Sequence, residues 1–125
     1  RRYRFSWKYT YYRWPAAIRS VIADMIKSIV KCRIKSCGNE NIEEELSRRK
    51  YDIVICDFSM PGMNGIQVSN IAKKINEEVF FCLMTGWVGN FNNNMTKNID
   101  LILNKPINKE KLREMFISYK DMVNM

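Results

Sequence analysis

Residues 51–65 read YDIVICDFSMPGMNG and join an apolar run to a turn. The run YDIVICD (51–57) is rich in β-branched side chains and shows no polar alternation, which is typical of a strand buried on both faces of a sheet. The segment SMPGMNG (59–65) carries one Pro and two Gly, the residues that mark turns. The stretch therefore predicts a buried strand that ends in a carboxylate, Asp57, at a tight turn.

Strand and helix patterns alternate along the chain on both sides of this stretch. Apolar runs predict strands at 32–38, 51–57, 79–85 and 100–104, and helical spacing predicts helices at 16–30, 41–50, 66–75 and 108–123. Asn108 is a candidate N-cap. Residues 89–98 are rich in Asn, which favours turns and caps, so we expect a short helix there at most. The alternation predicts an α/β fold: a flavodoxin-like, doubly wound, five-stranded parallel sheet of order 2-1-3-4-5 with helices on both faces.

This fold needs one more strand before the first helix, and only the opening segment RRYRFSWKYTYYRW (1–14) can supply it. The segment holds seven aromatic and five basic residues. Aromatic and polar residues alternate from Tyr3 to Tyr11, a period of two that predicts a strand with one wet face. Such a pattern suits an edge strand, whereas the fold requires a central one.

Three interpretations of residues 1–14 stay open. Codons for WKYTYYRW (7–14), read one nucleotide forward, can encode Gly-Asn-Ile-Leu-Ile-Ile-Asp, so the segment can be a frameshifted apolar strand that ended in an acid. A basic, aromatic arm can instead stack on single-stranded nucleic acid, and an appended tag would look similar. The segment carries +5 of the net charge of +8, so the rest of the chain gives little reason to expect a nucleic-acid partner.

The composition excludes several classes of function. The chain has no His, which excludes an internal His-based triad and a His phosphocarrier. Its four Cys form no CxxC pair, so we expect no zinc site. Cys56 and Cys82 lie within apolar runs, where we expect small buried side chains. We see no secretory signal and no apolar run long enough to cross a membrane, and we expect a cytoplasmic domain with reduced thiols.

Three predicted strands are followed by side chains suited to phosphate chemistry. Asp57 ends one strand, Thr85 ends the next, and Lys105 follows the last within NKP. The carboxyl ends of parallel strands share one edge of the sheet, where ligands bind. A carboxylate can act as the nucleophile, and a hydroxyl and an ammonium can hydrogen-bond phosphoryl oxygens and offset their charge. Each residue alone is more often a cap or a solvated side chain, but together they predict phosphoryl transfer.

The motifs YDIVICDFSMPGMNG, MTGW and NKP, in this order, resemble the receiver domain of two-component response regulators from about Pro15 to Phe116. The resemblance implies that Asp57 accepts a phosphoryl group from a histidine kinase or phosphotransfer protein. It implies that Thr85 and Lys105 bind the phosphoryl group. Receiver domains catalyse their own phosphorylation and dephosphorylation but act mainly as signalling modules.

The resemblance also implies a magnesium ion held by Asp57, by the backbone carbonyl of Ser59 and by two adjacent acidic residues that end the first strand. A cis bond before Pro106 is implied as well. In this chain the positions of the acidic pair hold Tyr12 and Arg13. Since phosphoryl transfer to a carboxylate depends heavily on the ion, we expect poor phosphorylation if the sequence is taken literally.

The function therefore has two interpretations at this stage. The first is a phosphorelay receiver that is phosphorylated on Asp57. The alternative is a pseudo-receiver that only binds partners, with Arg13 neutralising Asp57. The aromatic residue that the family usually has three positions before Lys105 is Ile102 here, and TGWVG (85–89) resembles receivers of hybrid histidine kinases. We divide the chain into an atypical segment (1–14) and a receiver domain (15–125), and leave open whether it forms a homodimer.

Overall fold

Strands and helices alternate in the computed structural model, which describes residues 3–13, 16–37, 41–59, 62–86 and 91–123. The strands are β1 (Tyr3–Arg13), β2 (Val30–Cys37), β3 (Ile53–Asp57), β4 (Phe80–Thr85) and β5 (Leu101–Asn104). The helices are α1 (Ala16–Ile29), α2 (Ile42–Ser47), α3 (Gly65–Ile75), α4 (Asn93–Thr96) and α5 (Lys109–Val123). The predicted strands and helices are thus present, and the Asn-rich segment forms one short helix, as expected.

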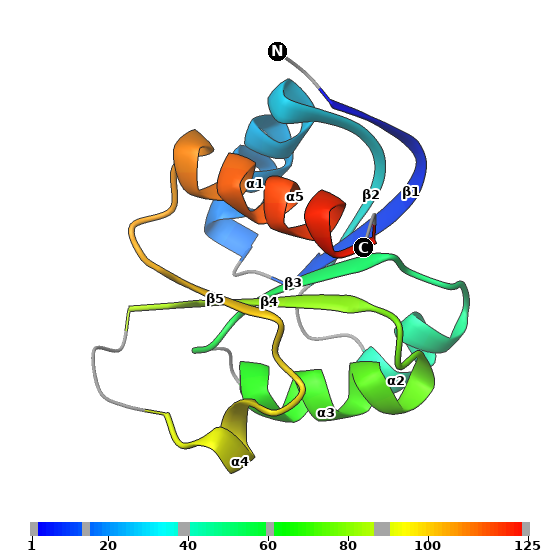
Figure 1. Ribbon diagram of the computed structural model, residues 1–125, viewed down its shortest axis with the longest axis vertical. Helices are drawn as coiled ribbons and strands as arrows, with labels where there is room; N and C mark the ends of the chain where they lie inside the picture. The colour runs from blue at the N-terminus through cyan, green and yellow to red at the C-terminus, as the bar shows by residue number, and fades with distance from the viewer. Residues whose placement is uncertain (1–2, 14–15, 38–40, 60–61, 87–90, 124–125) are drawn as a thin grey trace.

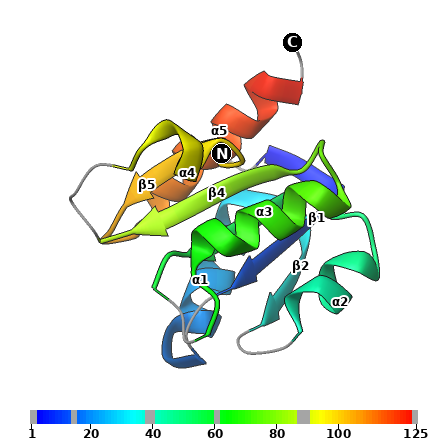
Figure 2. The ribbon, with the colours of Figure 1, turned by 90° about the horizontal axis from the view of Figure 1, so that it is seen from below.

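The strands form one parallel sheet of order β2-β1-β3-β4-β5. Helices α1 and α5 cover one face of the sheet, and α2 and α3 cover the other (Figures 1 and 2). The order and the two helical layers confirm the predicted doubly wound topology. Within the described residues, no helix is both long and apolar enough to cross a membrane.

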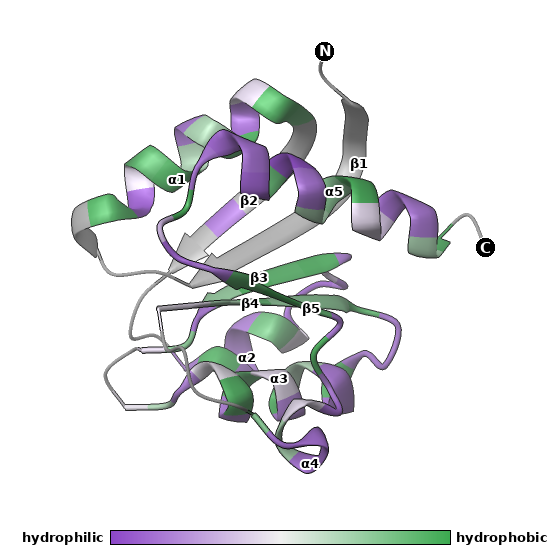
Figure 3. Ribbon diagram, turned by 60° about the vertical axis from the view of Figure 1, so that its left-hand side comes forward, coloured by the Kyte–Doolittle hydropathy of each residue, from purple (hydrophilic) through white to green (hydrophobic). Residues whose placement is uncertain are grey.

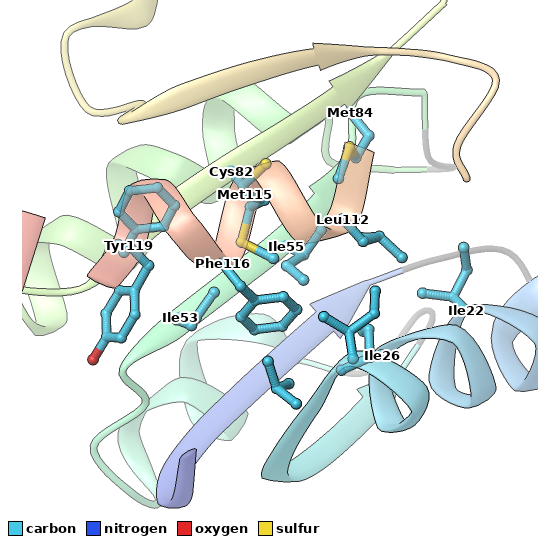
Figure 4. Packing of buried hydrophobic residues seen from close by; sticks show 13 residues of the cluster. Ile22, Ile26, Ile53, Ile55, Cys82, Met84, Leu112, Met115, Phe116 and Tyr119 are labelled. Carbon is cyan, nitrogen blue, oxygen red and sulfur yellow. The ribbon is translucent and has the colours of Figure 1, made fainter. Parts of the chain in front are cut away.

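The two central apolar strands supply both faces of the core. Every residue of β3 and β4 is buried, and β3 is drawn mostly in the hydrophobic colour in Figure 3. Ile53 and Ile55 pack with α1 and α5, whereas Val54 and Cys56 pack with α2 and α3. Figure 4 shows the first of these clusters, with Phe116 of α5 between β3 and α1. Alternate side chains of one strand point to opposite faces, so an unbroken apolar run was required here.

Two of the predicted helices end earlier than expected. The helix expected to reach residue 30 ends at Ile29, because Val30, a β-branched residue, pairs with Tyr3 as the first residue of β2. The helix expected over 41–50 ends at Ser47. Its basic residues therefore follow the helix instead of forming its last turn, and the C-cap Arg48 pairs with Glu44 at 3.1 Å.

Residues 3–13 form the predicted strand, but not at an edge of the sheet. β1 lies between β2 and β3. Only its last four residues, from Thr10 to Arg13, pair with β3, while Tyr3 and Arg4 pair with β2 alone. Most residues of the alternating pattern therefore lie in the part of β1 that extends beyond β3. The last four residues of β1 occupy an interior position because their backbone hydrogen-bonds to β2 on one side and to β3 on the other. This placement puts Tyr12 and Arg13 beside Ile55 and Cys56 of β3.

Candidate functional site

The structure brings the three predicted side-chain positions together at the carboxyl edge of the sheet. Asp57 is the last residue of β3, Thr85 is the last residue of β4, and Lys105 directly follows β5. The ammonium of Lys105 lies 2.8 Å from Oδ1 of Asp57. The backbone amide of Lys105 donates to the carbonyl of Thr85 at 2.8 Å. Asp57 is 2 % exposed and Thr85 1 % exposed, whereas the side chain of Lys105 is 33 % exposed and reaches the site from the surface.

Two donors converge on one carboxylate oxygen. Oδ1 of Asp57 accepts from the ammonium of Lys105 and from the backbone amide of Ser59, the latter at 3.2 Å. A buried carboxylate is stable only when a countercharge and hydrogen bonds replace its lost hydration. The Lys105–Pro106 peptide is cis, as the resemblance implied.

Backbone hydrogen bonds hold the loop after Asp57 close to β4 and to the start of α3. The amide of Phe58 donates to Met84 at 2.9 Å, and its carbonyl accepts from Gly65 at 3.2 Å. Gly62 has a φ of +84°, which favours glycine. Asn64 then begins α3 with a capping box closed by Gln67. These bonds fasten the loop to both β4 and α3.

We expect Gly65→Ala to destabilise the domain by about 1–3 kcal/mol, because the added methyl would overpack this loop. A Cβ at Gly65 would lie 2.3 Å from Cδ1 of the buried Leu83 and 3.2 Å from Cα of Phe58. Urea unfolding measures the change. Gly86→Ala is the matched control, since its Cβ would meet only Cδ of Lys105 at 3.9 Å. Equal stability of the two variants would contradict the account.

We expect Lys105→Ala to lower the free energy of unfolding by about 1–3 kcal/mol, because it leaves the buried Asp57 carboxylate without its cation. Adding Asp57→Asn should restore part of that loss, since no buried charge then remains. The control is Lys50→Ala, which breaks the exposed 3.6 Å pair with Glu78 and should cost under about 1 kcal/mol. If Lys105→Ala lowers the free energy of unfolding no more than Lys50→Ala does, the Asp57–Lys105 pair does not stabilise the domain.

The residues present do not fit a magnesium ion. In the described part of the chain, no group of three or more His, Cys, Asp or Glu residues could hold a metal. Asp57 supplies one carboxylate, which already contacts Lys105. The neighbouring strand ends in Tyr12 and Arg13, neither of which is an acid. Magnesium prefers an octahedron of oxygen ligands anchored by carboxylates. The Ser59 carbonyl as a ligand stays a prediction.

The thiol of Cys56 donates to the backbone carbonyl of Asp57 at 3.3 Å. Cys56 and Cys82 are in no disulfide bond and are buried, as predicted. Burial raises the pKa of the Cys82 thiol, so it remains protonated and unreactive near neutral pH. The side chains of Cys32 and Cys37 lie outside the described part of the structure.

An aromatic pair next to Asp57 was not expected from the sequence. The rings of Phe58 and Phe91 meet edge to face, with centroids 5.5 Å apart and planes at 75°. Phe58 follows Asp57 directly, and Phe91 lies in the Asn-rich segment that precedes α4. Nothing in the local pattern pairs them, because their contact depends on how the loops after β3 and β4 lie.

Comparison with protein families matches residues 16–117 to the response regulator receiver domain. The chain belongs to this family. The match begins at Ala16, the first residue of α1, and does not include β1. The matched residues include Asp57, Thr85 and Lys105, which lie at the carboxyl ends of three strands at one edge of the sheet. The comparison with curated proteins finds no match.

Three solved structures show the same fold. The response regulator TrrA from Thermotoga maritima, in complex with Mg²⁺ and BeF, is 22% identical, with a TM-score of 0.73 over 94% of this chain and 98% of that one. A structure of the histidine kinase ThkA in complex with TrrA matches at 22% identity with a TM-score of 0.74, over 90% of this chain and 97% of that one. The receiver domain of a Pseudomonas aeruginosa sensor histidine kinase, with a magnesium ion in its active-site cleft, matches at 15% and 0.74, over 90% and 97%. At these identities the similarity concerns the fold.

Proposed function

We propose that this receiver domain of two-component signalling binds a histidine kinase or phosphotransfer protein but is not phosphorylated at an appreciable rate on Asp57. The single observation that carries the proposal is the donor set at the sheet edge. Among the described residues no further acid joins Asp57 to form a metal site; Asp57 is paired with Lys105, and the neighbouring end of β1 holds Tyr12 and Arg13. A kinase partner is supported by the similar fold of TrrA, which has been solved with the kinase ThkA.

The charge balance explains why phosphorylation would be slow. Phosphorylation would replace the single negative charge of the buried Asp57 carboxylate by the about two negative charges of an acyl phosphate. The ammonium of Lys105 offsets one of them. A metal ion in such a site is worth several kcal/mol of charge stabilisation, and Lys105 cannot replace a divalent ion. Arg13, the last residue of β1, is proposed to supply a second positive charge that neutralises the unphosphorylated Asp57.

The second candidate function is phosphorylation of Asp57 itself. It is favoured by the 2.8 Å contact between Asp57 and Lys105 and by the position of Thr85 at the end of the neighbouring strand. TrrA, of similar fold, binds Mg²⁺ and BeF. If residues 1–14 arise from a frameshift, the restored frame would supply an acid where this chain has none. Gene sequencing, together with the intact mass of the expressed chain, tests the frameshift.

Acetyl phosphate with magnesium separates the two candidates. We expect the intact mass of this chain to stay unchanged, as does that of its Asp57→Asn variant. A phosphoryl adduct that forms only with magnesium and is lost in Asp57→Asn would overturn the proposal and establish the second candidate. Salt-dependent binding of a single-stranded oligonucleotide would reveal the nucleic-acid arm instead.

A further inference from the structure

The peptide unit between Asn104 and Lys105 is held at both of its polar ends. Its N–H group donates to the backbone carbonyl of Thr85, the last residue of β4, at 2.8 Å. Its carbonyl oxygen accepts from the side-chain ammonium of Lys111 in α5. A peptide unit is planar and nearly rigid, so two bonds on opposite sides fix its orientation. The direction in which the Lys105 side chain leaves the backbone therefore depends on both bonds.

That direction matters because Lys105 carries the cation that Asp57 contacts. Its ammonium lies 2.8 Å from Oδ1 of Asp57, which is almost fully buried. A lysine stem is long and flexible, so holding it in one geometry costs entropy unless the backbone already aims it correctly. The Lys105 side chain is partly exposed, and packing restrains it only in part. The two bonds to the preceding peptide unit therefore help to aim its ammonium at Asp57.

Lys111 reaches this peptide unit from an anchored position in the first turn of α5. Its backbone amide donates to the side-chain oxygen of Asn108 at 2.9 Å, and the amide of Leu112 donates to the Asn108 carbonyl at 3.2 Å. Leu112 is fully buried in the core between α5 and the sheet. The stem of Lys111 therefore starts from a fixed point, and its ammonium reaches back across the turn after β5 to Asn104.

The charge of Lys111 is unfavourable for the helix alone. A cation in the first turn of a helix is repelled by the positive end of the helix dipole. The contact with the Asn104 carbonyl compensates for this, because hydrogen bonds from charged donors are the stronger kind. The same contact polarises the peptide unit and strengthens the bond from the Lys105 N–H group to Thr85. Lys111 thus acts on the site through the backbone of Lys105.

We propose that Lys111 is a positioning residue that orients Lys105 toward Asp57 through the Asn104–Lys105 peptide unit. The inference goes beyond the proposed function, because it concerns the Asp57–Lys105 pair of the unphosphorylated chain. It applies equally to a chain that is phosphorylated and to one that is not.

The NMR signal of the Lys105 ammonium tests the proposal, with Asp57→Asn supplying the signal of a Lys105 that has lost its carboxylate partner. Lys111→Met keeps an unbranched stem but removes the charge and the donor. We expect it to move the Lys105 signal toward that of the Asp57→Asn reference. We also expect exchange of the Lys105 backbone amide to rise about tenfold, since a charged hydrogen bond to the same peptide unit is lost. Lys111→Arg retains a cationic donor and should restore both readouts.

Lys109→Met is the matched control, because Lys109 lies in the same turn of α5 but is exposed. It should change neither readout. Lys111→Gln, which is shorter and uncharged, takes the place of Lys111→Met if that variant does not fold. Four outcomes would overturn the proposal: an unchanged Lys105 signal in Lys111→Met, an equal change in Lys109→Met, no restoration by Lys111→Arg, or a rise in amide exchange that is uniform along α5. Since neither metal nor phosphoryl donor is used, failure here is distinct from failure of the proposed function.

Discussion

Replacing Tyr12 and Arg13 together by Asp should create a magnesium site beside Asp57. The register places these residues next to Ile55 and Cys56, so two new carboxylates would stand one strand away from Asp57. Three carboxylates meet the preference of magnesium for anchored oxygen ligands. We expect saturable binding of magnesium by calorimetry. We also expect phosphorylation of Asp57 by acetyl phosphate to rise at least about 100-fold, because a bound metal ion supplies several kcal/mol.

The matched control replaces the same two residues by Asn, which has the shape of Asp but no charge. It should gain neither magnesium affinity nor phosphorylation. Asp57→Asn in the two-Asp background should lose the phosphoryl adduct. A folded two-Asp variant that binds no more magnesium than the Asn control would show that residues 12 and 13 are not the missing metal positions.

The largest stability loss is expected for Phe116→Ala, at about 3–5 kcal/mol. Phe116 is fully buried where α5 meets the sheet and α1 (Figure 4). Its removal leaves a cavity that the rigid β3 and β4 cannot close. Urea unfolding measures the loss, and Phe116→Leu, with a smaller expected loss, serves if the Ala variant is unfolded.

Its neighbour Ile117 provides the control. Ile117 lies on the same helix but is 38% exposed, so Ile117→Ala should cost less than about 1 kcal/mol. Similar losses for the two variants would contradict the packing of α5 described above.

The sequence predicted the fold best where burial leaves few alternatives. β3 and β4 are buried on both faces, and only an unbroken apolar run satisfies such a position. The convergence of Asp57, Thr85 and Lys105 could also be predicted, since parallel strands bring their carboxyl ends to one edge. These predictions depend on chain order and burial alone.

Contacts between distant segments could not be predicted in the same way. The ammonium of Lys73 in α3 lies 2.7 Å from Oδ2 of Asp100. The same oxygen accepts a hydrogen bond from the backbone amide of Phe81 at 2.7 Å. The contact of Phe58 with Phe91 likewise depends on the shapes of two loops. Neither pair leaves a periodic signal. The end of α1 was missed for another reason, because Val30 fits a helix pattern and a strand equally well until its pairing is known.

In the described part of the chain, Asp57 contacts Lys105 but has no acidic neighbours that would hold a metal with it. A magnesium titration of the unaltered chain, followed through the NMR signals of the Asp57 and Ser59 amides, tests this inference. We expect no saturable change at either amide at millimolar magnesium. A saturable shift of both amides that disappears in Asp57→Asn would contradict it, because the chain would then hold the ion without the acidic pair.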